Sequence, residues 1–222
     1  MALTGQNIAD RARRVLQDSP AIRWLDAEVL DWINDAQREI VTLKPNANSV
    51  AADLVLAISE TKQSLPTGGL WLFDVVRNSS GRAVRRIDRS TLDAEEPTWH
   101  ASTANASVRH FLYDEATPTI FWVYPKQPAT APGTVHIVYS KLPTDLANLA
   151  GALSLSDMYA ANILDYVCYR CYLKDSDNSG NAARAASHIS AFTGSLGARV
   201  QVEGASSPNA RIVYAGGNTK RG

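Results

Sequence analysis

The residues of this chain that could do chemistry are few and widely spaced. Cys168 and Cys171 form a Cys-x-x-Cys pair, a spacing found in zinc sites and in redox motifs. A structural zinc ion needs four ligands, and the sequence holds no second cysteine pair. A redox pair usually opens a helix after a strand, whereas this pair falls near the end of a predicted helix. The pattern therefore favours two buried core cysteines.

The four histidines are dispersed, at positions 100, 110, 136 and 188. A small hydrolase could use His100 or His110 with nearby acids, and it would show a deep polar pocket with a histidine or carboxylate of perturbed pKa. His110 and His136 fall in predicted strands and could face one another, but ordinary strand histidines are the favoured interpretation. The chain has no G-x-G-x-x-G, Walker, G-x-S-x-G or H-E-x-x-H motif, which weighs against the common enzyme classes. We expect no catalytic residues, no metal ligands and no cofactor.

The densest basic segment contains Arg82, Arg85, Arg86 and Arg89. These side chains could contact the phosphates of a nucleic acid, and such binding would depend steeply on salt. Four acidic residues lie between positions 88 and 96, so a solvated or salt-bridged strand edge is favoured. The whole chain carries 22 basic and 22 acidic residues, whereas a sequence-independent nucleic-acid binder usually has a basic excess.

Length and composition limit the class of protein. A chain of 222 residues, 45% of them hydrophobic, can bury about 70% of its unfolded surface. One domain, or one domain with an insertion, is the default. No apolar run approaches the roughly 20 residues of a membrane span, and the arginine-containing N-terminus does not predict a secretory signal. Two cysteines indicate a reducing compartment without a disulfide framework.

Helical periodicity occupies both ends of the chain. Apolar residues recur at helical spacing in four segments, which predicts helices at residues 6–18, 26–44, 157–173 and 182–198. Asp26 is expected to cap the second helix, which Pro45 ends. In the fourth helix, Ala186, Ile189, Phe192 and Leu196 are expected to form the buried stripe.

Between residues 50 and 142 the pattern changes to about six short strands. The turn at 78–81 predicts a hairpin of 70–78 with 82–88, and a second hairpin should join 108–114 to 119–125. A last strand is expected at 134–143. This spacing predicts a small antiparallel sheet or sandwich.

The element order predicts an α+β fold, in which about four helices from both chain ends form a bundle around an inserted antiparallel β-rich domain. The expected boundaries are 1–49 for the N-terminal helices, 50–143 for the β-rich insertion, 144–203 for the C-terminal helices and 204–222 for an extended tail. The tail contains the β-prone word Arg211, Ile212, Val213 and Tyr214. This word either adds as a strand to a partner or belongs to a disordered end.

The words of residues 23–48, RWLDAEVLDWINDAQREIVTLKPNAN, resemble the opening of the head-to-tail adaptor (connector) proteins of tailed bacteriophages. There a short helix precedes a W-x-D-x-E-L-L-x-W-L-N-D-A-Q-R-E-I-like helix and a Pro-Asn turn. The later words QSLP, LFDVVRN, GRAVRRIDR and LSDMYAANILDYVCYRCYLKD are also similar. The resemblance covers most of residues 6–200 and leaves the tail after residue 203 without a counterpart.

The resemblance implies a structural virion protein at the head–tail junction, made in the host bacterial cytoplasm. It would form a ring of about twelve copies under the portal, link the capsid to the tail and form part of the DNA channel. Its partners would be the portal protein, a downstream tail or nozzle protein, further copies of itself, and genomic DNA passing without sequence-specific binding, with no membrane involved. A tail-tube or tail-completion protein is the alternative.

Two sets of residues are candidates for contacts in such an assembly. The tail residues Arg211, Ile212, Val213 and Tyr214 are candidates for contacting the portal, because the tails of such adaptors often reach it. Charged residues on the second and third helices could bridge neighbouring subunits in the ring, and these are Asp35, Arg38, Glu39, Arg170 and Lys174.

Overall fold

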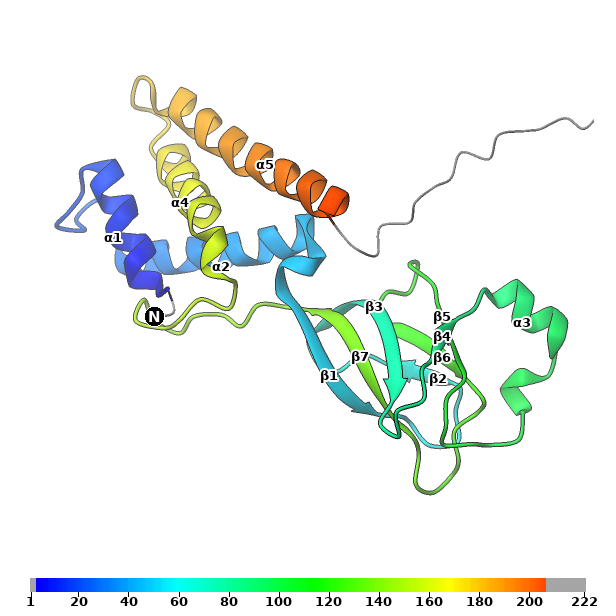
Figure 1. Ribbon diagram of the computed structural model, residues 1–222. Coiled ribbons are helices and arrows are strands. Elements are labelled where there is room, and N and C mark those ends of the chain that lie inside the picture. Colours follow the sequence, from blue (N-terminus) through cyan, green and yellow to red (C-terminus); the bar gives the residue numbers. More distant parts are fainter. Residues whose placement is uncertain (1–2, 207–222) are drawn as a thin grey trace, which may run out of the picture.

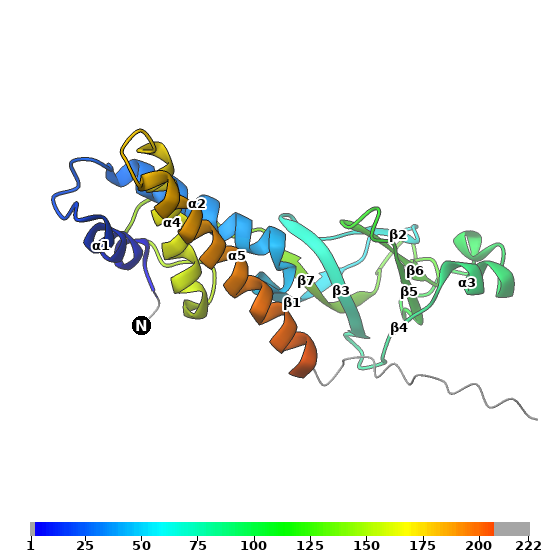
Figure 2. The ribbon, with the colours of Figure 1, turned by 90° about the horizontal axis from the view of Figure 1, so that it is seen from above.

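The computed structural model describes residues 3–206 and shows a mixed α+β fold. These residues contain the helices α1 (Gly5–Leu16), α2 (Asp26–Leu43), α3 (Arg89–Glu95), α4 (Ala160–Lys174) and α5 (Asn181–Ser206). The strands are β1 (Ser49–Val55), β2 (Lys62–Ser64), β3 (Gly69–Asn78), β4 (Arg85–Arg86), β5 (His110–Tyr113), β6 (Ile120–Tyr124) and β7 (Thr134–Lys141). Four helices lie together at one end of an elongated molecule and the strands lie at the other, with α3 beyond them (Figures 1 and 2).

Helix α2 begins at the predicted residue and ends one residue before the predicted end, but its first turn differs from the expectation. Leu25, and not Asp26, occupies the cap position, and no side chain caps the helix. Asp26 instead forms an ion pair with Arg13 of α1. The predicted cap was wrong because a carboxylate beside a largely buried guanidinium gains more from a charged partner than from a backbone N–H.

Helices α1, α2, α4 and α5 share one hydrophobic cluster with the segment 146–159, whereas α3 packs in a separate, smaller cluster. On α5, Phe192 and Leu196 are buried as predicted, but Ala185 is buried in place of Ala186. Residue 185 lies seven positions before Phe192, two helical turns along the same face. Helix α5 also runs to Ser206, eight residues beyond the predicted end.

The strands form two sheets over a second hydrophobic cluster. The three-stranded sheet has the order β1-β7-β3 and is antiparallel throughout, and the four-stranded sheet has the order β2-β6-β5-β4. The predicted hairpin of β5 with β6 is confirmed. The other predicted hairpin is present only next to its turn, where Arg77 bridges Ala83 and the amide of Val84 donates to the carbonyl of Val76 at 3.2 Å. Beyond Val84 the prediction was wrong, because the chain crosses to the second sheet, where β4 runs parallel to β5.

The start of α1 is hydrogen-bonded to the segment that follows the strands. The amide of Gln6 donates to the carbonyl of Leu149 at 2.6 Å, and the amide of Gly5 donates to Gly151 at 3.0 Å. A Cβ atom on Gly5 would lie 2.9 Å from Cδ1 of Leu146. Backbone atoms of Leu149 lie 3.1 and 3.3 Å from the same position, so this tight approach favours glycine and ties the N-terminus to residues 146–151.

The two larger hydrophobic clusters divide broadly along the lines of the sequence pattern. One cluster takes its buried residues from 8–41 and 146–196, and the other takes them from 56–139. The domain boundaries at residues 49, 143 and 203 remain predictions. The tail word Arg211 to Tyr214 lies outside the described residues.

Both cysteines are free and buried within α4. Burial raises the pKa of the Cys168 thiol to about 12 and raises the pKa of Cys171 further.

At pH 8 the folded chain should therefore react with a thiol-alkylating reagent at least about a thousandfold more slowly than the urea-unfolded chain, since the thiolate is the nucleophile. Quenching the alkylation at a series of times and weighing the products by mass spectrometry measures both rates. Rapid labelling of the folded chain would contradict two inert core cysteines.

Candidate functional site

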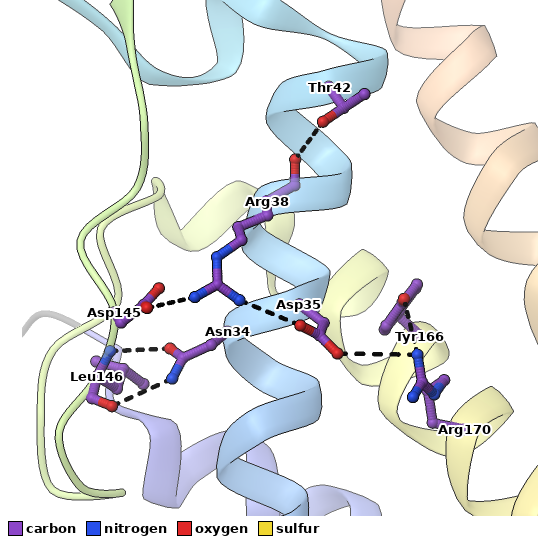
Figure 3. Close-up of polar contacts among 8 residues, drawn as sticks. All are labelled: Asn34, Asp35, Arg38, Thr42, Asp145, Leu146, Tyr166 and Arg170. Atoms are coloured by element: carbon purple, nitrogen blue, oxygen red, sulfur yellow. Dashed lines mark hydrogen bonds and ion pairs between the residues drawn. The ribbon is translucent and has the colours of Figure 1, made fainter. Parts of the chain in front are cut away.

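Helices α2 and α4 bring together most of the charged residues proposed for subunit contacts (Figure 3). Nη1 of Arg38 donates to Oδ1 of Asp35 at 3.1 Å, and Oδ2 of the same carboxylate lies 3.8 Å from Nη1 of Arg170. The second terminal nitrogen of Arg38 pairs with Asp145, on the segment that returns from the strands. The result is a charged seam from this returning segment across α2 to α4.

The remaining candidates lie beside this seam. Lys174 pairs with Glu28, so α2 and α4 are bridged a second time, near the end of α4. Glu39 is partly exposed and makes neither an ion pair nor a side-chain hydrogen bond within residues 3–206. Four of the five predicted residues therefore have partners in their own chain. Their side chains are also between one third and one half exposed, so the seam faces solvent as well.

Asn34 joins α2 to the returning segment beneath the exposed charges. Its Nδ2 donates to the carbonyl of Leu146 at 3.1 Å, and its Oδ1 accepts from the amide of Leu146 at 2.8 Å. The Asn34 side chain is buried. It therefore supplies the hydrogen-bond partners of a backbone amide and carbonyl that water does not reach. Gln37, one turn further along α2, accepts from the amide of Ser154 at 2.9 Å.

A second polar cluster, here called the clamp, holds the end of α5 and consists of Lys44, Tyr159, Arg199 and Glu203. Lys44 is only 3% exposed, and its Nζ donates to Oε2 of Glu203 at 2.6 Å. The ammonium of Lys44 lies 5.7 Å from the centre of the Tyr159 ring, and the guanidinium of Arg199 lies 5.3 Å from it. Arg199 also donates to the carbonyl of Met158 at 2.7 Å.

The sequence pattern missed Asn34, Asp145, Lys44 and Glu203. Asn34 and Gln37 are polar residues among the apolar positions of α2, which is a signal of buried hydrogen bonding that a pattern search could use. Lys44 and Glu203 are 159 residues apart, so no local spacing relates them.

The hydrolase alternative finds no assembled catalytic group in the described part of the chain. A hollow of about 550 Å³ is lined by residues that include Arg86, Trp99, His100 and Trp122. Nδ1 of His100 shares a hydrogen bond of 2.8 Å with Oγ1 of Thr61, and its ring stacks on Trp99. Within residues 3–206, His100 has no carboxylate partner. The hollow therefore contains no hydrogen-bonded series of nucleophile, base and acid of the kind that hydrolases use.

The other histidines do not assemble such a group either. His136 lies on the face of β7 that is turned away from the core shared by the two sheets, so the idea that it faces His110 of β5 was wrong. His136 pairs with Asp53, and His188 pairs with Asp165, each at 2.9 Å. Over the described range, no set of three histidine, cysteine or acidic side chains is placed to hold a metal ion.

The basic segment is an exposed edge of the second sheet. Arg85 and Arg86 form β4, and Arg89 pairs with Asp93 at 3.3 Å. Arg82, Arg85 and Arg86 are exposed and form no ion pair within the part of the chain that the structure describes. Of the solvated or salt-bridged edge expected from the sequence, the described residues show the solvated form at β4, and the ion pair of Arg89 lies within α3. None of the helices in that part has the length and apolar character needed to cross a membrane.

Truncating Asn34 and truncating Arg38 should have different costs. Asn34→Ala leaves the buried amide and carbonyl of Leu146 without partners, and we expect it to lower the free energy of unfolding by about 2 kcal/mol. Arg38→Ala breaks ion pairs that face solvent, and its cost should stay under about 1 kcal/mol. Urea denaturation of the two variants beside the parent chain measures both. Equal costs would contradict the assignment of Asn34 as the stronger link.

The clamp should make stability depend on pH. The hydrogen bond from Lys44 holds the pKa of Glu203 below its ordinary 4.5. Burial alone would lower the pKa of Lys44, but hydrogen bonding to Glu203 and Tyr159 outweighs it and raises the pKa above 10.5. The carboxylate therefore contributes stability above pH 4.5, which is lost as the pH falls through its lowered pKa. The ammonium contributes below pH 10.5, and that contribution is lost as the pH rises through the raised pKa.

Glu203→Gln removes this dependence. The difference in unfolding free energy between the parent chain and Glu203→Gln should be constant between about pH 5 and 10 and shrink below about pH 4. Glu115→Gln, at an exposed loop position, is the matched control and should show no such change. A difference at pH 3 as large as that at pH 7 would refute the role given to the carboxylate.

Comparison with known proteins identifies the family to which this chain belongs. The chain matches the SU10 adaptor protein family over residues 3–212. This range includes α1, α2, the strands, α4 and α5. No curated protein matches the chain. The family is one of structural phage proteins and not of enzymes. Because the match spans nearly the whole sequence, this chain belongs to the SU10 adaptor protein family, the head-to-tail adaptors of tailed bacteriophages.

Proposed function

We propose that this protein forms a ring of about twelve copies under the portal, where it links the capsid to the tail and forms part of the DNA channel. The observation that carries the proposal is the family match over residues 3–212. Genomic DNA would pass through the ring without sequence-specific binding, and a downstream tail or nozzle protein would bind below it. The protein would then be a virion component of the head–tail junction, after synthesis in the host bacterial cytoplasm.

The shape of the chain suits this assembly. Helices gather at one end and strands at the other (Figure 2), so the helices can pack side by side around a ring while the strands face outward or tailward. In this arrangement the β-rich segment is an insertion in a helical bundle built from both chain ends. The equal numbers of acidic and basic residues also suit a conduit, since a strongly basic lumen would hold the passing genome.

The seam on α2 and α4 is the proposed contact between neighbours. A ring needs a heterologous interface that closes by rotation. Asp35, Arg38, Arg170 and Lys174 are paired internally but partly exposed, so they can also meet charges of a neighbour. Glu39 is a charge on this face that has no ion pair within residues 3–206, and we assign it a direct bridge to the next copy. The tail residues Arg211, Ile212, Val213 and Tyr214 are assigned to the portal.

Native mass spectrometry with the portal ring from the same genome tests the proposal. The portal should bind about twelve copies of 24.0 kDa each, a gain of about 290 kDa. Glu39→Arg should lower the number of bound copies, because it replaces the bridging charge with the opposite one. A chain ending at Gly204 should bind the portal more weakly, since it lacks the tail.

Glu60→Arg, on an exposed loop of the β-rich part, is the matched charge reversal and should leave the copy number unchanged. Binding to tail components without binding to the portal would favour the tail-completion alternative. Full occupancy by Glu39→Arg would remove Glu39 from the subunit contact.

A further inference from the structure

The hollow of about 550 Å³ lies between the four-stranded sheet and the segment that contains α3. Leu112 and Trp122 are directly paired on β5 and β6, so their side chains share one face of the sheet. Trp99 and His100 come from the segment after α3, and Leu92 of α3 packs with Trp99 and Leu112 in one small cluster. The volume falls within the range of small-molecule sites, roughly 300–1,000 Å³.

Contacts inside the chain hold the aromatic walls of the hollow in place. The ring of His100 stacks on that of Trp99 with the two centroids 3.6 Å apart, and Nε1 of Trp99 donates to Oδ1 of Asp93 at 2.8 Å. The hydroxyl of Tyr113 is hydrogen-bonded to two backbone groups, at 3.2 and 3.0 Å. Because Trp99 covers one face of the imidazole, the other face is left for a ligand. Walls that are ordered before binding lose little entropy when a ligand enters.

The charged side chains that line the hollow have both signs. They are Arg86, Arg89, Asp88, Asp114 and Glu115. A polyanion would meet three carboxylates there, and a cation would meet two guanidinium groups. An uncharged ligand with several hydroxyl groups can use both kinds, because carboxylates accept hydrogen bonds and guanidinium groups donate them. The lining therefore favours a neutral, polar ligand.

Several polar groups of the lining are left without partners by the chain itself. Asp88 precedes α3 but does not cap it, and within residues 3–206 neither its carboxylate nor that of Glu115 forms a side-chain hydrogen bond or an ion pair. Over the same range, Nε1 of the half-buried Trp122 donates to no acceptor. Two acceptors and one donor are thus available beside the aromatic walls.

We infer that this hollow binds a saccharide. One side of a pyranose ring presents C–H groups, which suit the electron-rich face of an aromatic ring, and the hydroxyl groups around its edge both donate and accept hydrogen bonds. Trp122 and His100 supply the aromatic faces. Asp88 and Glu115 accept from the hydroxyl groups, and Arg86 donates to them. The inference concerns binding without reaction and does not depend on the proposed ring.

The test uses the full chain with glucose, galactose and N-acetylglucosamine, each as the single sugar and as its linear trisaccharide. Saturation-transfer NMR and tryptophan fluorescence measure binding, and at least one single sugar should bind saturably with a Kd of about 1 mM. Tighter binding of its trisaccharide would identify a glycan chain as the ligand, and equal binding a single sugar ring. Trp122→Ala should weaken binding about tenfold or more, because it removes an aromatic face. The matched control is Phe73→Ala, at an exposed aromatic position of the other sheet, and it should bind like the parent.

A second variant decides the matter if circular dichroism shows that Trp122→Ala is not folded. Asp88→Asn keeps the size of an exposed side chain and should weaken binding about threefold, because it replaces a charged acceptor by a neutral one. Asp74→Asn, at an exposed position of β3, is its control and should have no effect.

Three results would overturn the inference. The first is that none of the six sugars binds the parent chain. The second is that a sugar binds the parent and the folded hollow variants equally, which would place its site elsewhere. The third is that oligothymidylate binds in a salt-dependent manner, loses affinity in Trp122→Ala and is not displaced by any sugar, which would assign the hollow to single-stranded nucleic acid.

Discussion

The pairing of β1 with β7 is the constraint on which the rest of the structure depends. The chain leaves the helices at Pro45–Asn48 and returns after Lys141, and the register that sets Ser49 opposite Ser140 forces these two crossings together. Side chains then join them, since Asn48 donates to the carbonyl of Lys141 and Ser140 donates to that of Pro45, both at 2.7 Å. Because the exit and the return are adjacent, the segment that follows β7 arrives beside α2. The hydrogen bonds of Asn34 and the ion pairs of Arg38 depend on that arrival.

Two kinds of polar contact follow from this arrangement, and they suit different tasks. The Asn34 and Lys44 side chains are buried, where an unpartnered donor or acceptor carries a large penalty, so they fix geometry. The Asp35, Arg38 and Arg170 charges face water, where each pair contributes little. The molecule therefore combines buried contacts that fix its internal geometry with exposed ion pairs that contribute little to its stability.

The described residues support assembly more than chemistry. Two histidines pair with carboxylates. His136 does so on the face of a sheet, and His188 does so in the contact between α5 and α4. The surfaces that remain are the seam and the arginine edge at β4. An adaptor must hold several partners at once along a continuous path. Separate contact faces on a long molecule meet that requirement.

The sequence by itself determined the helices and most strands, because the period of apolar residues and the Pro, Gly and Asn turns are local signals. It also determined the family, through the words around α2. The tertiary structure alone decided that Asp26 turns to Arg13, that β4 runs parallel to β5 and that α5 continues to Ser206. Each of these depends on groups distant in the sequence. The clamp is the clearest case, since the partner that holds the end of α5 lies 159 residues earlier, beyond the range of any local pattern.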